Sequence, residues 1–168
     1  MRKSLLWLAS FAILASCAPA TTDDPAADGS AATATATDGM AGDRPIPVTP
    51  NELVWTDLDP TGAPGVRIAP IWGDPGSGAF GAFLRLPAGF TTPPHRHTHP
   101  MKLVIVSGTY VQQAGEDPPF RLGPGSYLMQ PGGDYRHITS CDPAADCVFF
   151  FESNGAFDLL PADGQPAS

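Results

Sequence analysis

Positive charge is scarce in this sequence. The 168 residues include 9 lysines and arginines against 17 aspartates and glutamates, so the formal net charge is −8 at pH 7. The basic residues form no cluster, and two of them, Arg2 and Lys3, stand at the start of the chain. A protein that binds nucleic acid needs a basic patch to neutralise phosphates. We therefore expect no nucleic-acid partner.

Long hydrophobic runs are also missing, apart from one short run near the N-terminus. Residues 5–15 are mostly apolar, follow the positive pair and precede small residues, an arrangement typical of an export signal. No later run is long enough to cross a bilayer. Residues 1–16 are therefore predicted to be a signal peptide rather than part of the folded domain.

The segment Leu14-Ala15-Ser16-Cys17 resembles the lipobox of bacterial lipoproteins. The resemblance implies cleavage before Cys17 and acylation of its thiol and its new amino group. Ala18 at the next position, rather than aspartate, is similar to the outer-membrane sorting pattern of Gram-negative lipoproteins. The expected location is the cell envelope, at the periplasmic face of the outer membrane, through an N-terminal lipid anchor. The alternative is an ordinary signal peptide cut at an A-x-A-like site, which leaves Cys17 without lipid.

Large apolar side chains are nearly absent from residues 18–45, where alanine, threonine, aspartate and glycine dominate and Met40 is the exception. Such a segment cannot bury enough apolar surface to offset the entropy lost on ordering. We predict a disordered tether over residues 17–47, which holds a folded domain over residues 48–168 away from the membrane.

Cysteine is rare, with three residues in the whole chain. If Cys17 carries lipid, Cys141 and Cys147 remain, and an exported location permits a disulfide between them. The short loop that this bond closes limits its entropic gain to roughly 2 kcal/mol. The alternative is a pair of soft metal ligands, but structural zinc thiolates usually have closer spacing. We predict the disulfide.

No helical period of useful length occurs after residue 48. Short apolar segments alternate with turns rich in glycine and proline, and five segments are predicted to be strands: residues 66–72, 79–86, 102–112, 126–130 and 147–152. A chain of this size supports one domain with one core. Many short strands separated by turns are typical of a β-sandwich or barrel, so the predicted fold class is all-β.

The aromatic residues are expected to have structural rather than catalytic roles. The tyrosines are Tyr110, Tyr127 and Tyr135, and such residues are more often barrel or rim residues than catalysts. The predicted core aromatics are Trp72, Phe83 and residues 149–151.

Histidine is also rare, but its four residues are concentrated. His95, His97 and His99 lie within five positions, and His137 follows in a second glycine- and proline-rich segment. Alternate residues of a strand face the same side, so His95 and His97 are expected to present both imidazoles together. Paired neutral imidazoles are ligands for Zn, Fe, Ni or Cu.

The two histidine segments resemble the two characteristic motifs of the cupin superfamily. The first motif is matched in register by Gly89, His95, His97 and Gly108, and the second by Gly125, Pro131 and Gly133. His137 comes one residue later than the second motif places its histidine, so its match requires a small shift or bulge. Residues 69–75 and 147–161 are further similar to small exported cupins related to the cupin half of ChrR anti-sigma factors. The resemblance implies a jelly-roll β-barrel.

The sequence departs from the cupin pattern at one ligand. Cupins usually have a glutamate where this chain has Met101, with Lys102 beside it. The resemblance then implies a site of His95, His97 and His137, as in cupins that hold a metal with three histidines and no carboxylate. His99 is either a fourth ligand or, as we expect, an exposed loop residue beside Pro100. A barrel that has lost its metal, with the histidines lining a small-molecule pocket, is the remaining alternative.

Two functions of different classes follow from this reading. One is a metal-dependent enzyme of the dioxygenase or isomerase type, in which the metal activates oxygen or acts as a Lewis acid on a small molecule. The other is a non-catalytic module that binds or senses a metal or small ligand in the cell envelope. Because cupins are often dimers, the resemblance also implies a homodimer as an arrangement to test.

Overall fold

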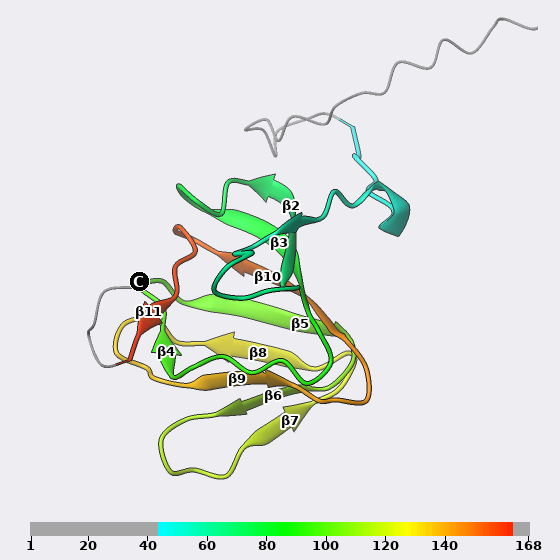
Figure 1. Cartoon of the computed structure of the whole chain (residues 1–168). Helices are drawn as coiled ribbons and strands as arrows, with labels where there is room; N and C mark the ends of the chain where they lie inside the picture. Colours follow the sequence, from blue (N-terminus) through cyan, green and yellow to red (C-terminus); the bar gives the residue numbers. More distant parts are fainter. Residues whose placement is uncertain (1–43, 163–168) are drawn as a thin grey trace, which may run out of the picture. The chain divides into compact units, whose positions relative to one another are not determined.

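The structure, a computed structural model, describes residues 44–162 of the chain (Figure 1). The predicted signal peptide, Cys17 and nearly all of the predicted tether lie outside these residues. Within them the single helical element is a 3-10 turn, η1 (Pro50–Glu52), and no helix is long and apolar enough to cross a membrane. The all-β prediction is confirmed.

The strands pair into three antiparallel sheets. A six-stranded sheet has the order β1-β2-β3-β10-β5-β8, a three-stranded sheet has the order β7-β6-β9, and β4 pairs with β11. In chain order the strands are β1 (Thr56–Asp57), β2 (Arg67–Gly73), β3 (Phe80–Leu86), β4 (His95–Arg96), β5 (Met101–Ser107), β6 (Tyr110–Gln113), β7 (Phe120–Leu122), β8 (Tyr127–Gln130), β9 (Ile138–Cys141), β10 (Cys147–Ser153) and β11 (Leu160–Pro161). The sheets face each other around one interior, as in a jelly roll (Figure 1).

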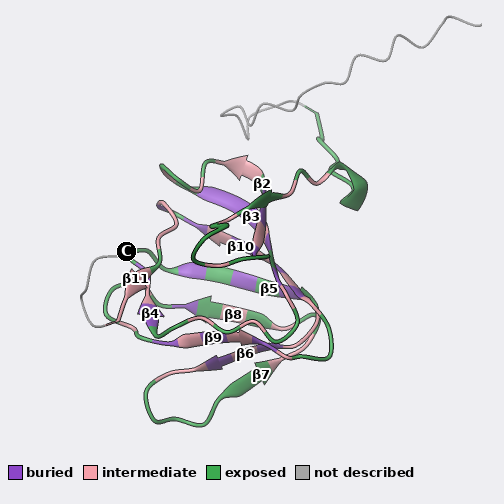
Figure 2. Cartoon of the chain, in the orientation of Figure 1, coloured by how far each residue is buried: buried purple, intermediate pink, exposed green. Residues whose placement is uncertain are grey.

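The long strands show the period of two that the sequence predicts. Along β5, Met101, Leu103 and Ile105 are buried while the residues between them are exposed. Figure 2 shows this alternation along β5, and β10 has buried residues at every second position. One face of the large sheet therefore lies on the core and the other faces outward.

The core contains some of the predicted aromatics and excludes others. Phe149 and Phe151 are buried, and the Phe151 ring packs edge-on against Phe80 with centroids 5.0 Å apart. Phe83 and Phe150 pair instead on the outward face of the sheet, where each is half-buried, and Trp72 is half-buried as well. The prediction that all of these aromatics belong to the core is wrong for these three. Strand alternation turns Phe83 and Phe150 away from the interior. Trp72 follows a register shift after Pro70, which pairs it with Gly81 rather than continuing the alternation from Ile68.

Gly108 divides a segment that the sequence predicts as one strand over residues 102–112. Its φ is +74°, and a Cβ at this position would lie 2.4 Å from the Asp146 carbonyl oxygen. Glycine alone accepts this backbone conformation and this close approach without strain. The chain therefore leaves the large sheet at Ser107 and enters the small sheet as β6.

A disulfide joins Cys141, the last residue of β9, to Cys147, the first residue of β10. Because β9 lies in the small sheet and β10 in the large one, the bond links the two sheets at one end. The cysteines are thus paired with each other in the described structure and stand apart from the histidines.

Candidate metal centre

His95 and His137 face each other across a β-bridge. The His95 amide donates to the His137 carbonyl and the His137 amide donates to the His95 carbonyl, each at 2.9 Å. Residues paired in this way have Cα atoms about 5.5 Å apart and side chains on the same face. The two imidazole centroids are accordingly 4.2 Å apart.

A one-residue register shift places His137 at this position. The Thr92 amide donates to the Thr139 carbonyl, so the three steps from Thr92 to His95 lie opposite only two steps, from Thr139 to His137, on the other segment. The extra residue falls at Pro93 and Pro94, which cannot donate ladder hydrogen bonds. As a result both Thr92 and His95 face inward, and His137 meets His95 while Arg136 stays exposed. The shift explains why the histidine comes one residue late in the second motif.

His97 completes a buried group of three imidazoles. Its ring centroid lies 4.9 Å from that of His95 and 5.3 Å from that of His137. Candidate ligand atoms of the three residues all lie within 4.8 Å of one another, and no ring residue is more than 5% exposed. Nitrogen ligands sit about 2.0–2.1 Å from zinc, so three nitrogens at this spacing can converge on one ion with small side-chain movements.

The Nδ1 atoms of two of these rings form hydrogen bonds with backbone carbonyl oxygens. His95 Nδ1 lies 3.0 Å from the Pro93 carbonyl oxygen, and His97 Nδ1 contacts the Asp158 carbonyl oxygen. A carbonyl can only accept, so each Nδ1 carries the proton and each Nε2 keeps a free lone pair. Such backbone contacts orient the imidazoles of metal sites.

Burial keeps all three rings neutral at physiological pH. Desolvation lowers the pKa of His95 to about 4 and that of His137 to about 3, and it also lowers the pKa of His97. The neighbouring imidazoles lower the pKa of His95 and His137 further, while carbonyls near the rings act in the opposite direction. Neutral imidazole is the form that binds a metal.

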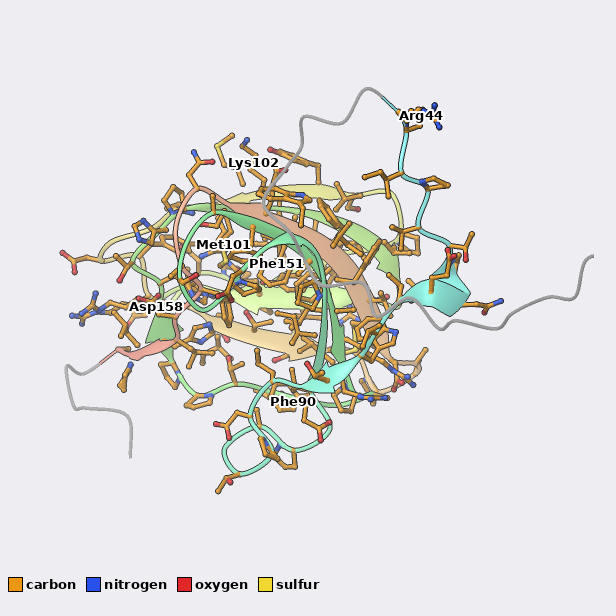
Figure 3. All side chains as sticks on the ribbon, turned by 90° about the horizontal axis from the view of Figure 1, so that it is seen from above. Arg44, Phe90, Met101, Lys102, Phe151 and Asp158 are labelled. Atoms are coloured by element: carbon orange, nitrogen blue, oxygen red, sulfur yellow. A yellow bond between two sulfur atoms is a disulfide. The ribbon has the colours of Figure 1, made fainter. Side chains whose placement is uncertain are left out.

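Met101 lines the same cavity as the three histidines. It is the first residue of β5, is 6% exposed and lies directly opposite Gln130 of β8 in the sheet register. Figure 3 shows Met101 on the inner side of the barrel near Phe151, while Lys102 points outward. The cavity wall therefore carries a thioether, and not a carboxylate, at this end of β5.

His99 lies apart from the other three histidines. It is exposed, and its ring packs so closely over Gly155 that a Cβ on that glycine would meet it at 2.4 Å. The structure thus brings together three of the four histidines named from the sequence and leaves His99 in the loop before Pro100.

The histidines line a cavity of about 680 Å³ inside the barrel. Most of its lining is apolar and includes Leu103, Phe149 and Phe151. Among residues 44–162, the lining contains no lysine or arginine, and its acidic residues are Asp59 and Asp158. The volume falls within the range of roughly 300–1,000 Å³ that is usual for small-molecule sites.

Two further polar residues line this cavity: Gln130, which the sequence analysis missed, and Tyr110, which it named as a barrel or rim residue. Gln130 is 1% exposed and its Nε2 lies 3.2 Å from His137 Nδ1. The Tyr110 hydroxyl donates to Gln112 Oε1 at 2.7 Å and lies 3.1 Å from Thr139 Oγ1. Burial raises the pKa of Tyr110, so its hydroxyl remains a donor. The place of Gln130 directly before Pro131 of the second motif was the available signal for that residue. Tyr110, predicted to be a barrel or rim residue, is buried in the barrel wall.

Comparison with known proteins identifies the fold. Residues 43–157 match the family model described as the ChrR cupin-like domain. The structure is similar to the polyketide cyclase RemF from Streptomyces resistomycificus, with a TM-score of 0.59 and 16% identity over 70% of this chain and 85% of that one. An RmlC-like cupin from Ralstonia eutropha gives a TM-score of 0.57 and 21% identity over 74% and 78% of the two chains.

The dimethylsulfoniopropionate (DMSP) lyase DddQ from Ruegeria pomeroyi is similar as well. Its TM-score is 0.54 and its identity is 19%, over 70% of this chain and 64% of that one. No curated protein matches the sequence. At these identities the solved structures share the fold, and they carry no information about substrate.

Proposed function

Because the chain belongs to the ChrR cupin-like domain family, we propose that it is a metal-binding cupin whose cavity binds a small molecule at the metal. One observation carries the proposal: three buried imidazoles meet at the wall of a mostly apolar cavity. Three neutral rings so close together leave polar nitrogens in an apolar interior, which is costly unless a cation or a hydrogen bond satisfies them.

The three residues fit a divalent transition metal. His95, His97 and His137 would hold it through Nε2, with Nδ1 fixed by the residues behind each ring. Neutral nitrogen ligands suit Zn, Fe, Ni or Cu, while Mn prefers oxygen ligands and should bind poorly. A metal bound there supplies Lewis acidity, or redox chemistry if it is Fe or Cu, to a molecule in the cavity.

A catalytic role is the second candidate. Three protein ligands leave a coordination position open, as in catalytic rather than structural zinc sites. No side chain of the described lining is an unengaged acid or base: the Asp158 carboxylate accepts from the amide and hydroxyl of Thr98, and that of Asp59 accepts from the amides of Thr61 and Gly62. Binding without turnover therefore ranks first, and an assay of oxygen uptake and product formation over a panel of small molecules separates the two.

The protein's place in the cell is part of the proposal. The lipobox-like segment before Cys17 supports export and acylation, which would tether the barrel to the periplasmic face of the outer membrane. Fatty-acid labelling of the wild type and of Cys17→Ser tests it. Label in the wild type alone supports the anchor, and equal label in both proteins, or in neither, refutes it.

The decisive experiment for the metal centre is metal stoichiometry by mass spectrometry after reconstitution. We expect one metal ion per chain in the wild type and in His99→Ala, and a nearly empty site in His137→Ala. His99 is the matched control, because it is the same residue type in the same motif but lies outside the buried group. A wild type that takes up no metal would refute the metal centre and leave the cavity alone.

A further inference from the structure

Gln130 has an unsatisfied polar atom at the cavity wall. The residue is 1% exposed and lines the cavity beside His137, and its Oε1 has no hydrogen-bond partner among the described residues. Leaving a buried amide atom unpaired costs about 1–3 kcal/mol in similar settings. An unpaired atom at this place indicates that a ligand supplies the missing partner.

A metal on His137 decides which atom of the Gln130 amide lies against the ring. Gln130 Nε2 now lies 3.2 Å from His137 Nδ1, an arrangement in which the amide donates and the ring proton is on Nε2. A metal on Nε2 requires the proton on Nδ1, which then needs an acceptor. A half-turn of the amide places Oε1 against Nδ1 and leaves the NH₂ group where Oε1 was. Gln130 then offers a hydrogen-bond donor to whatever lies beside the metal.

Met101 leaves the charge of the metal uncompensated. It lies opposite Gln130 in the sheet, so the two side chains are neighbours on the inner face. Three imidazoles and a thioether contribute no negative charge to a divalent ion. The acidic residues of the lining hold their carboxylates in hydrogen bonds elsewhere, Asp158 to Thr98 and Asp59 to its own turn. A cation in an apolar interior is stabilised most by an anionic partner.

We propose that the cavity takes an amphiphilic carboxylate, whose anionic oxygen meets the metal and the Gln130 amide while its apolar body fills the space lined by Leu103, Phe149 and Phe151. This inference rests on the proposed metal centre and names the class of its ligand. The absence of lysine and arginine from the described lining limits the ligand to one anionic group, because a second would have no cation to meet.

The test uses octanoate and octanol, which share an apolar chain and differ in the head group. Binding is measured by calorimetry to zinc-loaded protein of known zinc content, and to the same protein stripped of zinc. Octanoate should bind the zinc-loaded form at least about tenfold more tightly than octanol does, the order expected for a hydrogen bond to a charged group. The preference should vanish without zinc. In cobalt-loaded protein, octanoate alone should change the visible spectrum.

Two substitutions of Met101 separate the effect of a negative charge beside the metal from the effect of side-chain size. Met101→Glu adds a carboxylate and Met101→Gln is its neutral match in size. The preference for octanoate should fall about tenfold or more in Met101→Glu and survive in Met101→Gln. If Met101→Glu does not fold, Gln130→Leu at full zinc occupancy replaces it, and it should lose most of the preference as well.

The outcomes separate the two proposals. One zinc per chain with equal affinity for octanoate and octanol overturns the ligand class and leaves the metal centre standing. No zinc in the wild type overturns the metal centre, and a preference for octanoate that persists in zinc-stripped protein overturns the role of the metal in recognition.

Discussion

The two ends of strands β9 and β10 are built in opposite ways. At one end, His137 precedes β9 and Ser153 closes β10 opposite Met101, and polar groups face a cavity. At the other end, about 13–20 Å away by strand length, the Cys141–Cys147 disulfide joins the sheets. We call these the histidine end and the disulfide end.

The difference lies in how each end holds the chain. The disulfide end is closed by the chain itself: Gly108 packs against the backbone at Asp146, and the Asp146 carboxylate accepts from Arg85 and from the Ala88 amide. The histidine end keeps neutral imidazoles and an unpaired amide oxygen in a mostly apolar wall. A fold tolerates polar groups without hydrogen-bond partners at one end when its other end is held together independently. Substitutions at the disulfide end should therefore leave metal binding at the histidine end unchanged.

The largest effect is expected at the histidine end. Metal at about 1,000 times its dissociation constant should stabilise the wild type by about 4 kcal/mol, because it binds the folded state. His137→Ala should lose this gain together with the metal, while Cys141→Ser/Cys147→Ser should keep it. Thermal unfolding with and without zinc measures the gain. A metal-dependent shift that survives in His137→Ala would contradict the ligand assignment.

Acid should destabilise the metal-stripped protein through the same histidines. The pKa values of His95 and His137 in the folded state, about 4 and about 3, lie below the unfolded value of 6.5. The unfolded chain therefore binds more protons as the pH falls below 6.5, and stability present above that value is lost. Between pH 6.5 and 5 we expect a loss on the order of 1–2 kcal/mol for each ring.

Urea unfolding at several pH values across that range measures the loss. His137→Gln should make the free energy of unfolding of the metal-stripped protein fall less steeply with decreasing pH. The range stops at pH 5 because carboxylates begin to protonate below it. A stability that is flat between pH 6.5 and 5 in the metal-stripped wild type would show that the rings are not held neutral by burial.

Removing the disulfide should weaken the fold without emptying the site. The bond closes a short loop, with a sequence separation of 6, so Cys141→Ser/Cys147→Ser should cost about 2 kcal/mol. Chemical unfolding measures this cost, and mass spectrometry measures the metal content of the same samples. Loss of metal in the folded double variant would show that the two ends are coupled.

The smallest effect is expected for Arg85→Met at the disulfide end. Arg85 and Asp146 are both solvent-accessible, and exposed ion pairs add little because water screens them. The melting temperature should change much less than on loss of the disulfide, and metal content should stay the same. A fall in melting temperature as large as that of the disulfide variant would show that the Arg85–Asp146 pair is as important as the disulfide in holding the two sheets together.

The sequence predicted the long strands well because their burial has a period of two. β2, β3, β5, β8 and β10 each begin or end within one residue of the segment that predicts them at one end or both. β1 and β11, each of two residues, were missed because so short a strand has no period to detect. The break at Gly108 was missed because its cause, the close approach of the Asp146 backbone, is a tertiary contact.

The candidate site was predictable in its histidines and unpredictable in its surroundings. The spacing of His95 and His97 placed them on one face, but the register shift at Pro93 and Pro94 that aligns His137 depends on pairing between distant segments. The hydrogen bonds of Gln130 and Tyr110 could not be predicted from the sequence, because a buried amide or hydroxyl acquires its role from the partners that the fold brings to it.

The central position of β10 governs the order in which the barrel can be assembled. β10 lies between β3 and β5 in the large sheet, although it is the last long strand of the chain. Until residues 147–153 have been synthesised, β3 and β5 have no strand to join them, and each leaves an open edge. Pairing that waits for distant sequence is slow and exposes the unfinished chain to aggregation. The large sheet therefore cannot be completed until the strand that begins at Cys147 is present.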